Sequence, residues 1–232
     1  MRIAMWSGPR NLSTAMMYSF GARSDFHVMD EPFYGAFLAR TGIDHPMRTE
    51  ILAVHENNPA QVAESFATEL AGRPHLYMKH MAHHMLDGFP LGWAEGCVNV
   101  HLIRHPARVI ASYAAKREHP TLTDIGFEQQ ARIHATLGGL IVDSADIRAD
   151  PERMLRLLCD RIGIAFDASM LNWPAGPRAA DGVWAAHWYG AVHRSTRFAG
   201  PEGALPELTG EHADLLDQAM PHYRSMWDRR LT

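Results

Sequence analysis

The sequence lacks several features that would assign it to a common class of protein. It contains only two cysteines, Cys97 and Cys159, in 232 residues, too few for a disulfide framework. No apolar run is long enough to cross a membrane, and the N-terminal MRIAMW is too short for the apolar region of a signal peptide. We therefore expect a cytoplasmic protein with reduced thiols and no membrane partner.

A surplus of positive charge is also missing. The 22 lysines and arginines are outnumbered by 26 aspartates and glutamates, which gives a formal net charge of −4. General nucleic-acid binding usually requires a basic face, so no nucleic-acid partner is expected. An apolar fraction of 47% is ordinary for a globular protein, and the length predicts one α/β domain over residues 1–232.

Short apolar segments alternate with helical patterns along the chain. The predicted strands are Arg2–Trp6, Phe26–Met29, His75–Met78, Val98–Ile103 and Ala145–Arg148. The predicted helices are Ser13–Ala22, Pro59–Ala71, Pro106–Arg117 and a helix from the Asp150 cap to Ile162. This alternation predicts an α/β fold: a P-loop-like three-layer sandwich with a central, mainly parallel sheet. The Gly-, Pro- and aromatic-rich stretch 173–206 predicts an irregular C-terminal cover.

The most informative segment is IAMWSGPRNLSTAM, residues 3–16. A short strand runs into a turn and a helix start, where the first N–H groups have no backbone partner and can bind an anion. Gly8 would let the backbone approach that anion closely, Arg10 adds a planar charged fork, and Ser13 and Thr14 add hydroxyl donors. The segment lacks the Walker A pattern. The residues of this candidate anion-binding loop are Gly8, Pro9, Arg10, Asn11, Leu12, Ser13 and Thr14.

A second segment with a candidate anion site is VNVHLIRHPARVIASYAAKR, residues 98–117. Arg104 ends a predicted buried strand, and Ser112 lies in the helix that follows. Arg108 and Ser112 are four residues apart and therefore share a helix face. Arg104 could reach an anion that Ser112 also touches. Because the carboxyl ends of parallel strands meet at one edge of a sheet, this segment and the first loop are expected to converge there.

Two further segments place charge at predicted strand ends. Asp30 and Glu31 stand directly after a strand, where a charge is costly unless it is used or solvated. Lys79 ends another strand and could neutralise an anion. The nearby histidines are spaced for metal binding only if a helix starts at the first of them, and no carboxylate or cysteine completes a familiar pattern. We expect these histidines, His80, His83 and His84, to face substrate or form hydrogen bonds, with no metal.

These segments together resemble the sulfotransferase superfamily. The first loop is similar to its 5′-phosphosulfate-binding loop, in which a Lys or Arg precedes small hydroxyl residues. Arg104, with Ser112 eight residues later, resembles its 3′-phosphate-binding block. The segment around Glu31 resembles the one that supplies the general base in several carbohydrate and tyrosyl-protein sulfotransferases. Residues 181–198 stand where a late loop covers the nucleotide, without the usual R-K-G-x-x-G-D-W wording. The chain is similar to bacterial sulfotransferase-like proteins over at least residues 2–198.

The resemblance implies an enzyme that uses 3′-phosphoadenosine 5′-phosphosulfate as co-substrate. The sulfuryl group would pass to a hydroxyl or amine of a small-molecule or carbohydrate acceptor. Arg10, Ser13 and Thr14 would hold the phosphosulfate, and Arg104 and Ser112 would hold the 3′-phosphate. No metal is required, because a sulfuryl group carries less charge than a phosphoryl group and cationic side chains can compensate it.

The catalytic residues implied by the resemblance are Glu31, Lys79 and Arg10. Glu31 would be the general base, with Asp30 or one of the histidines His80, His83 and His84 as alternatives, and Lys79 would stabilise the group in transfer. Two other functions stay open: a non-catalytic nucleotide-binding module of the same family, and a P-loop nucleotide kinase, for which the loop lacks the lysine. The sequence specifies neither the acceptor nor the oligomeric state.

Overall fold

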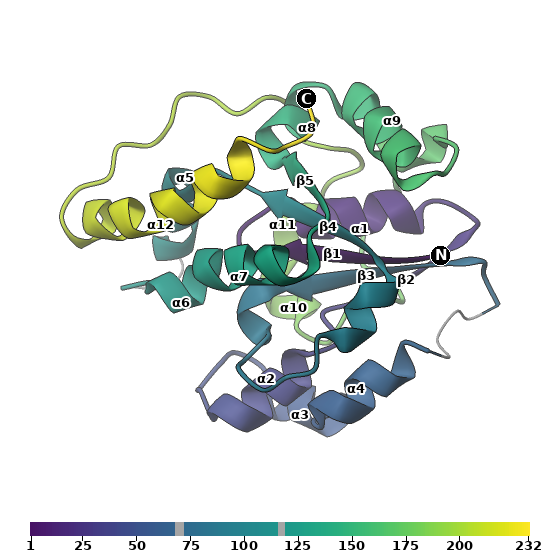
Figure 1. The fold of residues 1–232 in the computed structure, drawn as a ribbon, viewed down its shortest axis with the longest axis horizontal. Coiled ribbons are helices and arrows are strands. Elements are labelled where there is room, and N and C mark those ends of the chain that lie inside the picture. Colours follow the sequence, from purple (N-terminus) through teal and green to yellow (C-terminus); the bar gives the residue numbers. More distant parts are fainter. Residues whose placement is uncertain (68–71, 116–118) are drawn as a thin grey trace.

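The computed structural model describes residues 1–67, 72–115 and 119–232. Its centre is a five-stranded sheet in the order β2-β3-β1-β4-β5, and every neighbouring pair is parallel (Figure 1). The strands are β1 (Arg2–Ser7), β2 (Phe26–Asp30), β3 (His75–Met81), β4 (Val98–Ile103) and β5 (Leu140–Asp143). This arrangement confirms the predicted α/β class and the parallel sheet.

Helices connect the strands and cover the sheet on both faces. Those within the described residues are α1 (Ser13–Gly21), α2 (Tyr34–Thr41), α3 (Arg48–Val54), α4 (Pro59–Ser65), α5 (Pro106–Ala114), α6 (Leu122–Ile125), α7 (Phe127–Leu137), α8 (Ser144–Ala149), α9 (Pro151–Ile162), α10 (Ala185–Trp188), α11 (Gly190–His193) and α12 (Glu211–Trp227). Three short 3₁₀ helices, η1 (Ala82–His84), η2 (Gly92–Gly96) and η3 (Ala168–Leu171), join them. None of the helices in the described parts of the chain is both long and apolar enough to cross a membrane.

The period-two alternation of β1 divides the core between the two faces of the sheet. Ile3 and Met5 pack in the cluster that contains buried side chains of α1 and α9. Ala4 and Trp6 pack in a second cluster with side chains of α4 and α7. The long helix α12 completes the layer on the α7 side, where it contacts α5 and α7 (Figure 1).

One predicted strand is wrong. The segment 145–148 lies in helix α8, and the fifth strand is the preceding LIVD, β5. The Asp143 carboxylate accepts a hydrogen bond from the Ala145 backbone N–H at 2.8 Å. This N-cap starts a helix at the residue where the sequence pattern indicated a strand.

The ends of two predicted helices also differ. Helix α4 ends at Ser65, and the remainder of the predicted Pro59–Ala71 includes residues 68–71, which lie outside the described residues. Helix α5 ends at Ala114, and residues 116–117 of the predicted helix also lie outside the described residues. The predicted helix from the Asp150 cap to Ile162 is confirmed, with Gly163 in the left-handed region as its C-cap.

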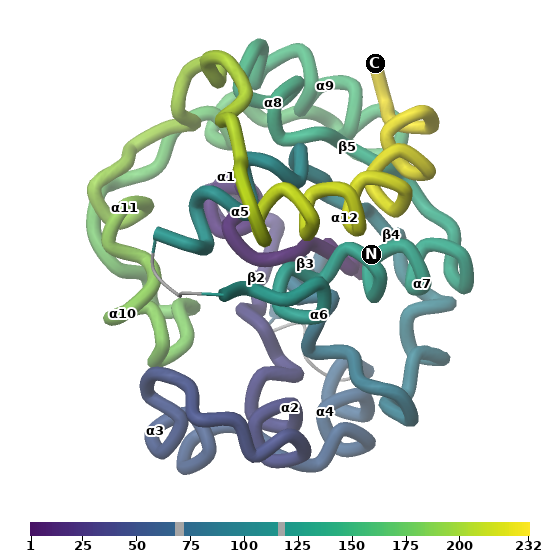
Figure 2. Tube along the Cα trace, turned by 90° about the vertical axis from the view of Figure 1, so that its left-hand side faces the viewer, coloured from purple at the N-terminus to yellow at the C-terminus, as the bar shows by residue number. Residues whose placement is uncertain are grey.

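The parallel order brings the segments after β1, β2, β3 and β4 to one edge of the sheet. The irregular chain that carries α10 and α11 lies beside this edge, in the yellow-green part of the trace (Figure 2). The sequence therefore predicted the edge of the sheet at which the candidate residues lie, and it predicted the irregular C-terminal cover beside that edge.

Candidate active site

A cavity of about 660 Å³ opens at the carboxyl edge of the sheet, bounded by the first loop and by the irregular cover. Nearly all residues that the sequence singled out for binding or catalysis line it. They are Pro9, Arg10, Asn11, Leu12, Ser13, Thr14, Glu31, Lys79, Arg104 and Ser112. Of the selected residues, Gly8 is not part of the lining.

Gly8 has a different structural requirement from the one expected. A Cβ at this position would lie 2.6 Å from the backbone oxygen of Ile125. The missing side chain therefore lets the first loop pack against the turn between α6 and α7. The close approach that requires glycine is between two segments of backbone.

The first loop is held by side chains that bond to neighbouring segments. Asn11 Nδ2 donates to the Leu102 carbonyl at 2.9 Å, and Asn11 Oδ1 accepts from the Leu12 N–H at 2.7 Å. Arg10 has a positive φ of 54°, and its Nε donates to Ser112 Oγ at 3.0 Å. Among the described residues no side chain caps the N-terminus of α1, so its first N–H groups stay available for an anion.

Arg104 connects the two anion-binding segments. Its Nη1 donates to the Arg10 carbonyl at 2.6 Å, and its Nε donates to Glu202 Oε1 at 3.1 Å. Ser112 Oγ accepts a hydrogen bond from Arg10 Nε. Arg104 and Ser112, which were predicted to share one anion, are therefore linked through Arg10 of the first loop. Arg108, on the same helix as Ser112, forms an ion pair with Glu202.

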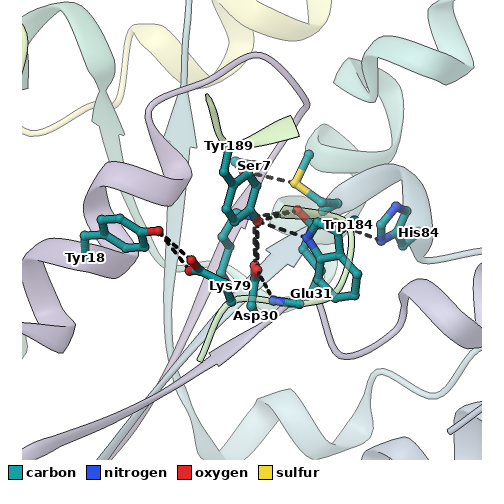
Figure 3. Close-up of polar contacts among 11 residues, drawn as sticks. Ser7, Tyr18, Asp30, Glu31, Lys79, His84, Trp184 and Tyr189 are labelled. Carbon is teal, nitrogen blue, oxygen red and sulfur yellow. Dashed lines mark hydrogen bonds and ion pairs between the residues drawn. The ribbon is translucent and has the colours of Figure 1, made fainter. Parts of the chain in front are cut away.

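The Lys79 ammonium lies at the centre of a buried polar network (Figure 3). Its three N–H donors have three acceptors: Asp30 Oδ1 at 2.9 Å, Tyr189 Oη at 2.6 Å and Glu31 Oε1. Trp184 Nε1 donates to the same Tyr189 oxygen at 3.1 Å. Lys79 therefore orients the carboxylates around it, because none of its protons is left for a ligand.

Glu31 combines an available oxygen with an unusual environment. Its Oε1 is paired with Lys79, while Oε2 lies 4.0 Å from His84 Nδ1. Burial raises the pKa of the Glu31 carboxyl above its ordinary value, and attraction to Lys79 offsets this rise only in part. The backbone φ is 42°, held by hydrogen bonds from the Glu31 N–H to the Lys79 carbonyl and from the Tyr34 N–H to the Glu31 carbonyl.

Asp30 and His80, two of the alternatives to Glu31, occupy different surroundings. Asp30 accepts from Lys79 and Tyr189 and, at 3.2 Å, from the Gly182 N–H, and it does not line the cavity. His80 lies on the opposite face of β3 to Lys79, stacked on Trp6 at 4.5 Å between ring centroids. Neither side chain lines the cavity, which favours Glu31 as the candidate base.

The other two histidines do line the cavity. β3 continues to Met81 and is followed by η1, so His80, His83 and His84 do not share a helix face. Burial lowers the pKa of His83 to about 4 and that of His84 well below its ordinary value. Across the described ranges, no three histidine, cysteine or acidic residues are grouped to hold a metal.

The late segment 181–198 forms the wall next to the first loop, as expected from its place in the chain. Trp184 is buried and donates a hydrogen bond to Tyr189. Both of these side chains line the cavity, together with Trp188 and Arg194. Tyr18 in α1 donates to the Asp181 carboxylate at 2.8 Å, which fixes the start of this wall to helix α1.

Comparison with known proteins identifies the family. A model described as a sulfotransferase domain matches residues 1–230. The chain belongs to the sulfotransferase domain family. The resemblance to the sulfotransferase superfamily is thereby confirmed.

Two curated relatives of this sulfotransferase-family chain come from Arabidopsis thaliana. Branched-chain-amino-acid aminotransferase-like protein 1 is 38% identical over 226 residues, and protein 2 of that name is 37% identical over 227 residues. Each alignment covers 95% of this chain and 40% of the relative. The chain therefore spans less than half the length of these relatives.

Two solved structures have the same fold. The sulfotransferase domain from the curacin biosynthetic pathway has a TM-score of 0.54 and 14% identity, over 94% of this chain and 96% of that chain. The sulfotransferase domain from the Synechococcus PCC 7002 olefin synthase has a TM-score of 0.54 and 19% identity, over 94% of each chain. Both support the parallel α/β architecture of this sulfotransferase-family chain.

Several residues of the site were missed by sequence reasoning. Tyr189 and Glu202 lie in the irregular cover and reach the site only through tertiary contacts. Tyr34 and His45, which also line the cavity, follow β2 without a recognisable motif. The aromatic content of the cover was the one available signal, and it did not identify individual partners.

Proposed function

We propose that the whole chain acts as one sulfotransferase unit that moves a sulfuryl group from 3′-phosphoadenosine 5′-phosphosulfate to a hydroxyl or amine. The observation that carries this proposal is that the first loop, Arg104 with Ser112, and Glu31 all line one cavity. A cytoplasmic location stays a prediction, which the free thiols of Cys97 and Cys159 support.

On the donor side, two cationic groups would hold the two ends of the nucleotide. Arg10 and the uncapped N-terminus of α1 would bind the 5′-phosphosulfate. Arg104 would bind the 3′-phosphate, and its bond to the Arg10 carbonyl would fix the spacing between the two subsites. Catalysis would then rest on positioning and charge compensation by these side chains, with no metal required.

On the acceptor side, Glu31 would act as the general base. Its Oε2 would take the proton as the acceptor oxygen or nitrogen forms a bond to sulfur. The bond from sulfur to the bridging oxygen would break, and 3′-phosphoadenosine 5′-phosphate would leave with that electron pair. Lys79 would position Glu31 and Asp30 instead of touching the group in transfer, because its donors are already used.

The acceptor would be a small molecule or carbohydrate that fits beside aromatic and imidazole groups. Tyr34, His45, His84 and Trp188 line this part of the cavity. Their rings can contact a flat apolar or sugar face. The lowered pKa of His84, caused first by burial, keeps that imidazole neutral, so a hydroxyl can hydrogen-bond to it.

The proposal is tested by calorimetry with 3′-phosphoadenosine 5′-phosphate and adenosine 5′-phosphate. The wild-type chain should bind the first far more tightly. Arg104→Ala should remove most of this preference and leave adenosine 5′-phosphate binding nearly unchanged, while the exposed Arg153→Ala should behave as wild type. Equal affinity of the wild type for the two nucleotides would reject the donor assignment.

A nucleotide-binding module without turnover is a second candidate, favoured by the fully engaged Lys79 ammonium. This candidate predicts tight binding of 3′-phosphoadenosine 5′-phosphate. It also predicts that no hydroxyl or amine acceptor leads to sulfuryl transfer from 3′-phosphoadenosine 5′-phosphosulfate. Tight ATP binding that depends on magnesium would instead favour a kinase.

A further inference from the structure

Three arginines from separate elements meet at one carboxylate beside the cavity. Arg104 follows β4, Arg108 lies in α5 and Arg148 lies in α8. Glu202 Oε1 accepts from Arg104 Nε at 3.1 Å and from Arg148 Nη1 at 2.7 Å, and Oε2 lies 3.0 Å from Arg108 Nε. The Glu202 side chain is only 4% exposed, so the arginines and not water compensate its charge.

The arginines also hold the backbone on either side of this glutamate. Arg148 Nε donates to the Gly200 carbonyl at 2.8 Å, and Arg108 Nη2 donates to the Gly203 carbonyl. Figure 2 shows this yellow-green segment passing α8 and α5 before it enters α12. The segment 200–203 is therefore fastened to the arginine cluster by one side chain and two carbonyls.

The cluster carries more positive charge than its occupant neutralises. Three guanidinium groups surround one carboxylate, which has two oxygens and a single negative charge. A phosphate monoester offers three terminal oxygens and close to two negative charges, and it matches arginine geometry in the same bidentate way. Arg104 and Gly200 both line the cavity, so the cluster borders the cavity at Arg104.

We propose that Arg104, Arg108 and Arg148 form the binding site for the 3′-phosphate of the donor, and that Glu202 occupies this site until the donor displaces it. The proposal rests on the proposed sulfuryl donor and adds two arginines and an internal competitor to it. A nucleotide without the 3′-phosphate leaves Glu202 in place. The apparent affinity for the donor thus equals the intrinsic affinity multiplied by the fraction of molecules in which Glu202 has left the arginines.

The test compares Glu202→Gln with Glu207→Gln, an exposed glutamate of the same segment, as a control of equal charge change. Calorimetry measures 3′-phosphoadenosine 5′-phosphate and adenosine 5′-phosphate on each folded variant and on the wild type. Glu202→Gln should bind the bisphosphate at least about tenfold more tightly than wild type. Its affinity for adenosine 5′-phosphate, and both affinities of the control, should stay within about threefold of wild type.

The outcomes separate this proposal from the donor assignment. If the wild type prefers the bisphosphate but Glu202→Gln binds it no more tightly, the competitor proposal is wrong and the donor assignment stands. If neither protein distinguishes the two nucleotides, both fail.

A second measurement uses only the wild-type protein, so it does not depend on the folding of a variant. Limited proteolysis with a glutamate-specific protease should cleave after Glu202, whose side chain is 4% exposed in the free protein, faster when the bisphosphate binds and at an unchanged rate with adenosine 5′-phosphate. Unchanged or slower cleavage after Glu202 with the bisphosphate would overturn the displacement.

Discussion

Replacing Glu31 by glutamine separates chemistry from donor binding. The glutamine amide oxygen can still accept from Lys79, which retains Asp30 and Tyr189 as its other acceptors. The change therefore preserves the shape of the buried network and removes the carboxylate oxygen that faces His84. We expect donor affinity to stay within about threefold of wild type, because Glu31 belongs to the acceptor side of the cavity.

The expected loss of turnover follows from the role of a positioned base. General-base catalysis contributes roughly 10²–10⁴-fold, which corresponds to about 2.7–5.5 kcal/mol of activation free energy. His84 is the nearest possible substitute, with Nδ1 4.0 Å from Oε2. Burial and the neighbouring His83 lower the pKa of His84 well below its usual value, so it is too weak a base to restore the rate.

The pH dependence gives an independent readout of the same residue. A base must be deprotonated, so turnover should rise with pH through the pKa of Glu31, which burial raises above the ordinary range of glutamate. This limb should disappear in Glu31→Gln. The assay is chromatographic release of 3′-phosphoadenosine 5′-phosphate at saturating donor, with the best acceptor from a panel of alcohols, phenols, sugars and amines.

We expect Glu31→Gln to lose activity without losing stability against unfolding. Because the folded-state pKa of Glu31 is raised, its contribution to the free energy of unfolding is present below the ordinary pKa and is lost as the pH rises through the raised one. Above this raised pKa the ionised carboxylate thus costs stability, and in that pH range Glu31→Gln should unfold at an equal or higher temperature. The surface control Glu152→Gln, which breaks an exposed pair with Arg156, should change neither property.

Two results would refute this reasoning. Turnover of a folded Glu31→Gln protein within about threefold of wild type would show that Glu31 is not the base. A parallel loss of donor affinity would show that Glu31 acts in donor binding instead.

Three further changes test the surrounding structure. Arg10→Ala should weaken 3′-phosphoadenosine 5′-phosphate binding by roughly 2 kcal/mol or more, and unchanged calorimetric affinity in a folded protein would contradict the loop assignment. Gly8→Ala places a Cβ 2.6 Å from the Ile125 oxygen and should lower the free energy of unfolding by about 1–3 kcal/mol in urea titrations. Gly92→Ala, with open space around it, should not. Tyr189→Phe leaves buried polar partners without their hydroxyl and should cost about 1–3 kcal/mol, so an unchanged urea midpoint would argue against the buried network.

The sequence predicted the parts of the molecule that depend on short-range patterns. β4 was predicted with its observed ends, because Arg104 directly follows a segment that has apolar residues at four of its six positions and contains no glycine or proline. The edge of the sheet that holds the first loop and Arg104 followed from the parallel topology alone. By contrast β5, four residues long, was missed because Asp143 ends it and caps the next helix at once.

The partners within the site could not be predicted, because they come from distant parts of the chain. Tyr189 reaches Lys79 across 110 positions, and Glu202 reaches Arg104 across 98 positions. Lys79 shows the same limit: the strand end placed it at the cavity, but its three acceptors, Asp30, Glu31 and Tyr189, come from two segments far from it in the sequence. A pattern read along the chain contains no information on such pairings.

The backbone at the site supports a functional reading of its side chains. Arg10 and Glu31 are two of four non-glycine residues with positive φ in the described part of the chain. Such conformations cost of order 1 kcal/mol or more and persist only where surrounding contacts impose them, here the bond of Arg104 to the Arg10 carbonyl and the bond between the Glu31 N–H and the Lys79 carbonyl. Glycine would relieve this cost at both positions. An arginine and a glutamate at two strained positions on the wall of one cavity therefore support the proposed binding role of Arg10 and the proposed base role of Glu31.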